Sequence, residues 1–469
     1  TSRSEGPACR PRPGWLMCLS DATMRGLMTR TDGRIGRALA LLAFLALAAL
    51  GHHRWGTVDA IQRLAVTNAV LTRGSVVTPE YGPVKYGPLQ PFLMLPTYAL
   101  GYGVGELTRA PEPGRVGYRV TAFLFTPVLV SLLVYLWYGF ARRWGQDRAR
   151  AAVGAWTLLW CTLVLPYSRL LFSEGLSATM LLAGVACLFV PRDEDRHPVG
   201  FFFLALASLH YVVFVPVLLV ACAALPFYEM GRGRPGEARR AILWGAAAIL
   251  FALVGWGAYN VARYGTPLRF GYAGESFSTP LLEGLYGLLA SPGRGLLYYS
   301  LPTAVAVVLA VRGVATWRDP AAARDATALL LFGSYLLLYA RWGSFEGGWC
   351  WGPRFLIPFI PLVHIALLAL LPRFRVAFYS VCAAGLLANA WEYSIEWGPY
   401  EKAMFGSGLI DYRRSVFELE YASALHGFAG STSIERLLQF AGIAFLSSFL
   451  VARVVRRHIA AEESGEAPG

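Results

Sequence analysis

The sequence predicts an all-α membrane protein, a bundle of about twelve membrane-spanning helices joined by loops. Of its 469 residues, 56% are hydrophobic and only 15% are charged, whereas a water-soluble protein of this length has about a quarter charged residues. Several apolar runs also approach the roughly 20 residues that a helix needs to cross a bilayer. Most of the surface is therefore expected to face lipid.

The distribution of positive charge along the chain predicts its orientation in the membrane. The net charge is +13, but the arginines gather in short segments between apolar runs, where they set topology and meet anionic headgroups. Nucleic acid is therefore not an expected partner. Arginines before the first run and the segment ARVVRRH after the last predict that both termini are cytoplasmic. We expect a multi-pass protein of the inner (plasma) membrane.

The expected organisation is one transmembrane domain, residues 34–452, with a disordered cytoplasmic leader at 1–33 and a cytoplasmic tail at 453–469. Its outer segments would be residues 52–88, 260–294, 341–354 and 391–433. The expected spans are 35–51, 89–104, 118–140, 153–171, 176–190, 201–225, 241–259, a run ending at 311, 326–340, 355–371, 376–390 and 434–451.

One loop conflicts with this count. Residues 141–150, ARRWGQDRAR, are basic and yet fall on the outer side, against the positive-inside rule. Either this loop packs under an outer segment, or a segment broken near Pro166 or His210 is miscounted. The same count places Glu174 on the inner side, with a structural role.

The first outer segment contains an amphipathic helix that we expect to lie on the bilayer surface. Apolar residues recur there at helical spacing, while Asp59, Arg63 and Thr67 fall on another face. Gly74 is expected to end the helix. Asp59 is the candidate catalytic carboxylate, because a carboxylate within reach can take the proton of a poorly nucleophilic sugar hydroxyl. The alternative is a structural salt bridge between Asp59 and Arg63, four residues apart.

Three basic residues at the ends of spans are candidate ligands of a lipid-linked phosphate: Lys85, Arg294 and Arg354. A lysine binds phosphate as a point charge, and the planar fork of an arginine suits two phosphate oxygens. The alternatives are a headgroup anchor for Lys85 and side chains that reach out to water for the two arginines.

Further candidates come from two outer segments. Glu346 and Trp349, near Trp351, form an acidic and aromatic cluster of the kind that binds sugar rings, although a tryptophan there can equally belong to an interfacial aromatic belt. Glu275 and Arg269 would close the site from the long segment 260–294, or pair with each other. No residue spacing indicates a zinc site or a disulfide framework; a divalent metal is possible but not indicated.

The sequence lacks a phosphate-binding loop, a dinucleotide fingerprint, a zincin motif and a nucleophile elbow. An enzyme that uses a nucleotide sugar would need a soluble nucleotide-binding domain. A donor dissolved in the membrane removes that need.

Two segments of the chain resemble a known group of enzymes. TVDAIQRLAVTNAVLTRG and KYGPLQPFLMLPTYALG resemble the first outer loop and second span of bacterial polyprenyl-phosphate-dependent glycosyltransferases. These belong to the membrane-embedded GT-C superfamily, with the protein mannosyltransferases and the aminoarabinose transferase of lipid A. RYGTPLRFGY, GLYGLLASPGRGLLYYSLP and GWCWGPRFLIPFIPL resemble recurring segments of the same superfamily.

The resemblance implies a GT-C-like bundle with an extracytoplasmic active site. Asp59 would be the base, and Lys85, Arg294 and Arg354 would hold the lipid phosphate. The reaction would be an inverting transfer of one sugar from a polyprenyl phosphate to a lipid, glycan or protein. The chain departs from many relatives in having Ala60 where a second acid follows the first, which weakens a metal-dependent version.

Three other functions agree with the same sequence features. A lipid flippase or transporter would place the charges along a path through the bilayer. A ligase or polymerase of surface polysaccharide would join whole oligosaccharides. A non-enzymatic scaffold in envelope assembly would need no chemistry at all.

Overall fold

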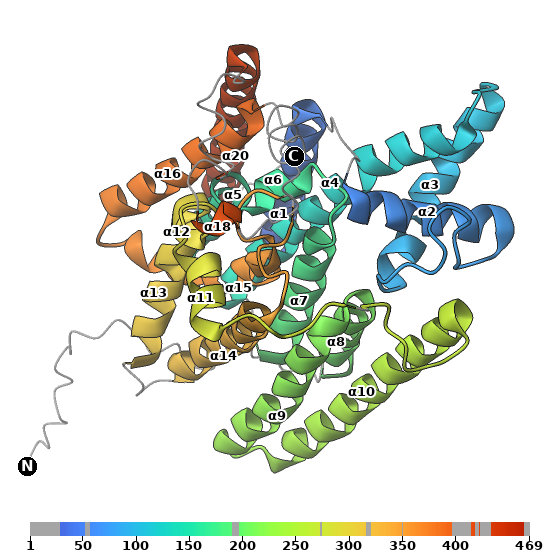
Figure 1. Cartoon of the computed structure of the whole chain (residues 1–469). Coiled ribbons are helices and arrows are strands. Elements are labelled where there is room, and N and C mark those ends of the chain that lie inside the picture. The colour runs from blue at the N-terminus through green and yellow to red at the C-terminus, as the bar shows by residue number, and fades with distance from the viewer. Residues whose placement is uncertain are drawn as a thin grey trace, which may run out of the picture.

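The computed structural model describes residues 29–51, 57–189, 197–272, 274–315, 320–348, 350–395, 414–417, 422 and 433–463. In these residues the regular elements are helices (Figure 1). The predicted all-α bundle is therefore confirmed. Most of the predicted leader and most of the outer segment 391–433 lie outside the described residues.

In the described part of the chain, five helices are long and apolar enough to span a membrane. They are α1 (Arg30–Leu50), α4 (Pro113–Arg143), the segment Val212–Gly231 that includes α9 (Val215–Gly231), α10 (Pro235–Tyr264) and α20 (Ile434–Glu463). Shorter apolar helices pack among them. Helix α1 starts at Arg30, inside the predicted leader, and α20 continues through Glu463, inside the predicted tail.

The start of α1 is attached to the loop between α4 and α5 (Arg148–Cys161). Asp32, fully buried, accepts hydrogen bonds from Arg142 at 2.8 Å and Arg148 at 3.0 Å. The basic loop 141–150 therefore lies at the same end of the bundle as the start of α1. Our count had placed this loop at the opposite end, and the structure corrects it.

Two differences from the predicted spans explain the error. Helix α3 (Leu89–Leu107) is not among the five long apolar helices; it packs against α4, where Gly101 and Gly117 let the two backbones approach closely. The predicted span 201–225 is two helices, α8 (His197–His210) and α9, separated at Tyr211–Phe214. If residues 89–104 do not form a span and residues 201–225 form two, the total number of spans is unchanged. The spans between these two segments then run in the direction opposite to the predicted one.

Helices α5 to α10 run in the directions that this correction gives. Helix α5 leads to a short α6 (Val164–Ser168), and α7 (Glu174–Phe189) begins beside the end of α8, since His210 Nε2 lies 3.1 Å from the Ser173 carbonyl oxygen. Helices α9 and α10 lie side by side at one edge of the bundle (Figure 1).

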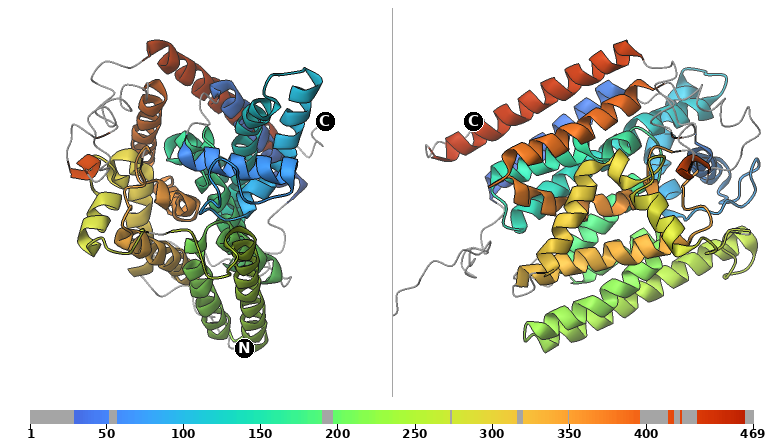
Figure 2. Two further views of the ribbon diagram at one scale, coloured as in Figure 1. Left: turned by 45° about the vertical axis from the view of Figure 1, so that its right-hand side comes forward. Right: turned by 60° about the vertical axis from the view of Figure 1, so that its left-hand side comes forward.

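The remaining elements complete the bundle. They are α11 (Leu281–Leu289), α12 (Leu296–Tyr299), α13 (Leu301–Ala315), α14 (Pro320–Arg341), η3 (Arg354–Phe359), α15 (Ile360–His364), η4 (Ile365–Leu370), α16 (Arg375–Ser394) and α18 (Arg414–Phe417). Helices α1, α16 and α20 form one side of the bundle (Figure 2).

The predicted span 355–371 forms the centre of the bundle, and its helix is irregular. It runs as a 3-10 helix, one α-helical turn and a second 3-10 helix. Pro358 and Pro361 lack the amide hydrogen that a continuous α-helix needs. The carbonyl oxygen of Pro361 accepts a hydrogen bond from Trp137 Nε1 on α4 at 2.7 Å, which fixes this segment against α4. This central segment carries Arg354 at its first turn.

Candidate functional site

Asp59 lies in the first turn of α2 (Val58–Arg73). The Thr57 side chain caps this helix by accepting a hydrogen bond from the Ala60 amide at 3.2 Å, and Gly74, in the left-handed conformation at φ 62°, ends it. The predicted helix and its end are thus confirmed. A carboxylate in the first turn also meets the positive end of the helix dipole. The residues around Asp59 therefore favour, by local interactions, its place in the first turn of a helix.

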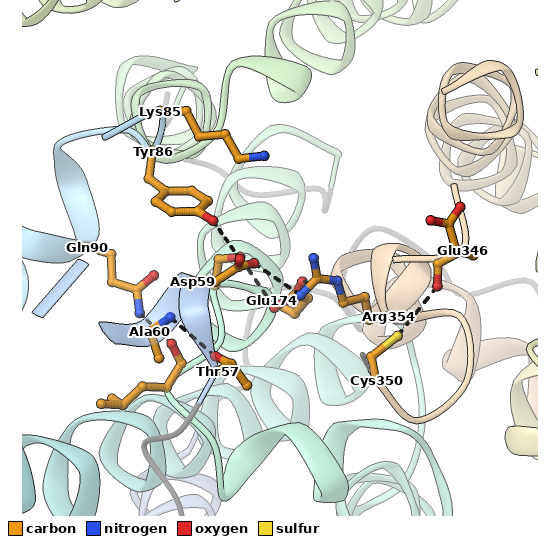
Figure 3. Close-up of polar contacts among 12 residues, drawn as sticks. Thr57, Asp59, Ala60, Lys85, Tyr86, Gln90, Glu174, Glu346, Cys350 and Arg354 are labelled. Carbon is orange, nitrogen blue, oxygen red and sulfur yellow. Dashed lines mark hydrogen bonds and ion pairs between the residues drawn. The ribbon is translucent and has the colours of Figure 1, made fainter. Parts of the chain in front are cut away.

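Both carboxylate oxygens of Asp59 are engaged. Oδ1 accepts a hydrogen bond from the Tyr86 hydroxyl at 2.5 Å, and Oδ2 lies 3.2 Å from Arg354 Nη1 (Figure 3). Tyr86 comes from the loop after α2, and Arg354 from the start of η3. Two of the predicted site residues, from opposite halves of the chain, thus meet in one cluster.

Arg354 also faces a second acid, Glu174, at the start of α7. Its Nε lies 3.9 Å from Glu174 Oε1 (Figure 3). Glu174 and Asp59 therefore lie on the same side of the bundle, and our placement of Glu174 on the inner side was wrong. The cause is the miscounted span at α3. Glu174 is 5% exposed, and a buried carboxylate of this kind needs the cation beside it.

The surroundings of Asp59 keep it ionised. Burial alone would raise the pKa of this carboxyl, but the charges of Arg354 and Arg63 and the hydrogen bond from Tyr86 outweigh it and lower the pKa to about 2. Burial raises the pKa of Tyr86, and the Asp59 charge raises it further. Tyr86 therefore stays protonated and acts as the donor.

Lys85 connects the loop after α2 to the long outer segment. Its ammonium forms an ion pair with Glu275 and lies 5.4 Å from the centre of the Tyr272 ring. The expected alternative, a pair between Glu275 and Arg269, is not formed: Arg269 is exposed and stacks on Tyr264, with 5.2 Å from its guanidinium carbon to the ring centre.

Arg294 and Glu346 are buried near the segment that leads to Arg354. The Arg294 Nη1 donates to the carbonyl oxygen of Cys350 and lies 3.2 Å from its sulfur, and the Cys350 thiol lies 3.6 Å from the Glu346 carbonyl oxygen. Arg294 thus supports the loop before Arg354. Trp349 lies outside the described residues.

Sequence reasoning missed three residues of this cluster: Glu174, Tyr86 and the role of Arg63. Tyr86 is adjacent to Lys85, but its contact with Asp59 depends on a loop conformation that no pattern reveals. The guanidinium of Arg63 stacks 4.0 Å from the centre of the Tyr86 ring. No carboxylate of the described residues lies within 4.0 Å of it, so the alternative of an Asp59–Arg63 salt bridge is not realised.

A metal site does not emerge from the residues that the structure describes. Among them, no three His, Cys, Asp or Glu side chains gather closely enough to hold an ion. The acids nearest the site, Asp59 and Glu174, share the Arg354 guanidinium. These residues therefore add no indication of a divalent metal to those sought in the sequence.

Comparison with known proteins places the fold. The sequence matches no protein-family model and no curated protein. Two crystal structures of ArnT from Cupriavidus metallidurans are similar to it, each at 16% identity. The complex with undecaprenyl phosphate has a TM-score of 0.54 over 92% of this chain and 78% of ArnT, and the apo structure 0.55 over 91% and 76%. The chain has the fold of ArnT.

The likeness to ArnT confirms the multi-span helical fold that the resemblance to the GT-C superfamily implied. At 16% identity it concerns the fold and leaves the chemistry to be argued from the site. The ArnT structure bound to undecaprenyl phosphate shows that this fold holds a polyprenyl phosphate in that protein.

Proposed function

We propose that the chain is a membrane glycosyltransferase that moves one sugar from a polyprenyl-phosphate donor to an extracytoplasmic acceptor. The observation that carries the proposal is the meeting of Asp59, Glu174 and Arg354 at one end of an ArnT-like bundle. Ionisable groups so close to the membrane are costly and are most often functional. Lys85 provides another cation near Tyr86.

The proposed reaction is a single displacement with inversion. The acceptor hydroxyl oxygen attacks the anomeric carbon, the bond from that carbon to the phosphate oxygen breaks, and the hydroxyl proton passes to Asp59. The electron pair of the broken bond stays on the polyprenyl phosphate. Arg354, Lys85 and Arg294 are the proposed cations of the leaving phosphate, with Arg294 acting through the loop before Arg354.

The contact between Asp59 and Arg354 links donor binding to proton transfer. A carboxylate with a pKa of about 2 is a weak base while Arg354 is paired with it. A donor phosphate that draws the guanidinium toward itself weakens this pair and raises the pKa of Asp59. The base therefore gains strength once the donor is bound.

The candidate binding residues for the sugar and the acceptor are Glu346, Trp349, Glu275 and Arg269. Glu275 lies beside Lys85, which favours a role near the donor phosphate. The proposed membrane orientation has both termini in the cytoplasm and the site outside, because α1 leads from its arginine-rich start to the Asp59 end.

A transporter or flippase is the main alternative, and a polysaccharide ligase is the next. The gathering of Asp59, Glu174, Arg354 and Lys85 at one end favours chemistry at one surface over a path through the bilayer. A ligase would use the same residues on a larger donor.

The test is transfer of label by the purified full chain in detergent. A panel of radiolabelled polyprenyl-phosphate hexoses and pentoses is supplied with a bacterial envelope extract as the acceptor source. The proposal expects release of polyprenyl phosphate and label in the acceptor fraction for at least one sugar. Vesicles that take up or flip the labelled lipid without breaking its sugar–phosphate bond would support the transporter instead. Transfer from an oligosaccharide donor alone would support the ligase.

A further inference from the structure

The cations around the site differ in what neutralises them. Arg354 faces the carboxylates of Asp59 and Glu174, and Lys85 is paired with Glu275. Arg63, by contrast, has no carboxylate of the described residues within ion-pair distance. Its guanidinium instead makes a cation–π contact with the face of the Tyr86 ring.

Arg63 is nevertheless almost completely buried. Its side chain is 1% exposed, and its Nη1 has no hydrogen-bond partner in the described part of the chain. A guanidinium stays charged at every relevant pH, and burying a charge without a contacting counter-ion is strongly unfavourable. The fold holds this charge in place, which is the arrangement expected where a ligand supplies the missing anion.

The acidic groups that face Arg63 lie beyond contact distance. Asp59 and Glu174 act on it from beyond contact distance, and His210 is buried nearby. The other neighbours are the phenols of Tyr211 and Tyr272. None of these groups forms a contact ion pair with the guanidinium.

The position of Arg63 relative to Lys85 suggests which anion this is. Both cations lie over the Tyr86 ring, Arg63 at 4.0 Å and Lys85 at 5.9 Å from its centre, and the hydroxyl of that ring holds Asp59. Both cations also act on the charge of Asp59, so an anion that they bind would lie near the proposed base.

We infer that Arg63 is a donor-binding residue that hydrogen-bonds the phosphate of the polyprenyl-phosphate sugar together with Lys85. This inference rests on the proposed function. Arg63 thereby joins Lys85, Arg294 and Arg354 as a proposed cation of the phosphate site. Tyr86 then has two roles, because its ring contacts Arg63 and Lys85 and its hydroxyl positions Asp59. Arg63 then holds the phosphate by its planar fork, while the guanidinium of Arg354 is drawn from Asp59 toward the same phosphate.

The test compares the binding of undecaprenyl phosphate with that of undecaprenol, its uncharged alcohol, to the full chain in detergent. Ligand-induced shifts of the thermal unfolding midpoint give both affinities. The variants are Arg63→Gln and Arg63→Lys, and the matched control is Arg73→Gln, an exposed arginine in the last turn of the same helix.

The wild type and the Arg73 control are expected to prefer the phosphate. Arg63→Gln is expected to lose at least tenfold in affinity for the phosphate and almost none for the alcohol. Arg63→Lys keeps the charge without the fork and is expected to lose several-fold. A wild-type preference for phosphate in Arg63→Gln overturns the inference, and where that variant does not fold, the same result in Arg63→Lys overturns it.

The outcome is separable from the proposed function. Sugar transfer by the wild type, together with unchanged phosphate preference in the Arg63 variants, removes this inference and leaves the transferase. Loss of phosphate preference in those variants, with no transfer by the wild type for any sugar, leaves the phosphate site and removes the transferase.

Discussion

The carboxylate of Asp59 lies 3.2 Å from the guanidinium of Arg354, a residue 295 positions later in the chain. Asp59 lies in α2, just after the first helix of the bundle, and Arg354 is the first residue of the irregular central helix. An ion pair between such distant segments requires the bundle to be folded before it can form. The pair therefore makes the proposed base dependent on the whole fold, and it makes Arg354 the residue that couples the base to a bound anion.

Two variants of Arg354 distinguish the effect of its charge from the effect of its planar guanidinium. Arg354→Ala leaves the half-buried Asp59 and the buried Glu174 without their common cation. Loss of one partner of a fully buried pair costs about 3–5 kcal/mol, which is the upper bound for this variant. Arg354→Lys keeps the charge but loses the fork, so a smaller loss of stability and of donor use is expected. Thermal unfolding and the KM for the lipid donor measure the two effects.

Equal stability and equal donor use in the alanine and lysine variants would contradict this role of Arg354. A suitable control is Arg73→Ala, because Arg73 is exposed in the last turn of α2, outside the cluster. That variant should leave stability unchanged within about 0.5 kcal/mol.

The low pKa of Asp59 predicts a stability change in acid. The folded-state pKa of about 2 lies below the ordinary 3.8, so the ionised carboxylate stabilises the fold at pH values above about 4. This contribution, about 2 kcal/mol, is lost as the pH falls from about 4 toward 2. Thermal unfolding of the wild type and of Asp59→Asn at pH 5, 4 and 3 measures it.

The wild type should lose stability toward pH 3 more steeply than Asp59→Asn does, because the variant has no carboxylate to protonate. Parallel curves for the two proteins over this range would show that Asp59 has no depressed pKa. Glu80→Gln, which removes an exposed acid from the loop after α2, controls for a general acid effect.

The corrected direction of the spans predicts the sidedness of two loops. A single cysteine at Gln146, in the loop tied to Asp32, should react with a membrane-impermeant thiol reagent only from the side of the N-terminus. A cysteine at Glu80, in the loop after α2, should react only from the other side. Labelling in intact and in opened cells measures this, in a background without the native cysteines.

Labelling of both positions from one side would return loop 141–150 to the side where the count of apolar runs had placed it. It would also separate Glu174 from Asp59 and remove the two-acid cluster.

Most of the fold could be predicted from the sequence, because apolar length and charge bias are local properties. Thr57 and Gly74 likewise bound α2 through their own side-chain and backbone chemistry. The errors came where packing decides. Helix α3 is apolar enough to resemble a span, yet its glycines pack it against α4. The break at Tyr211–Phe214 falls inside an apolar run.

The candidate site was predicted in part for the same reason. Asp59, Lys85 and Arg354 stand out as charges at the ends of apolar runs. Arg63 had been assigned to the polar face of an amphipathic helix, but Tyr86 gives it a buried partner. The side of Glu174 depended on the span count, and the pairing of Glu275 with Lys85 depended on how two loops fold together.

The most direct test of the account is sugar transfer by Asp59→Asn in purified full-length protein. The amide keeps the shape of the side chain and removes the base, so the variant should fold and bind polyprenyl phosphate, and its transfer rate should fall by about 10²–10⁴-fold. Glu174→Gln, the same acid-to-amide change at the other partner of Arg354, should keep measurable transfer. Turnover by Asp59→Asn within a few-fold of the wild type would contradict the account.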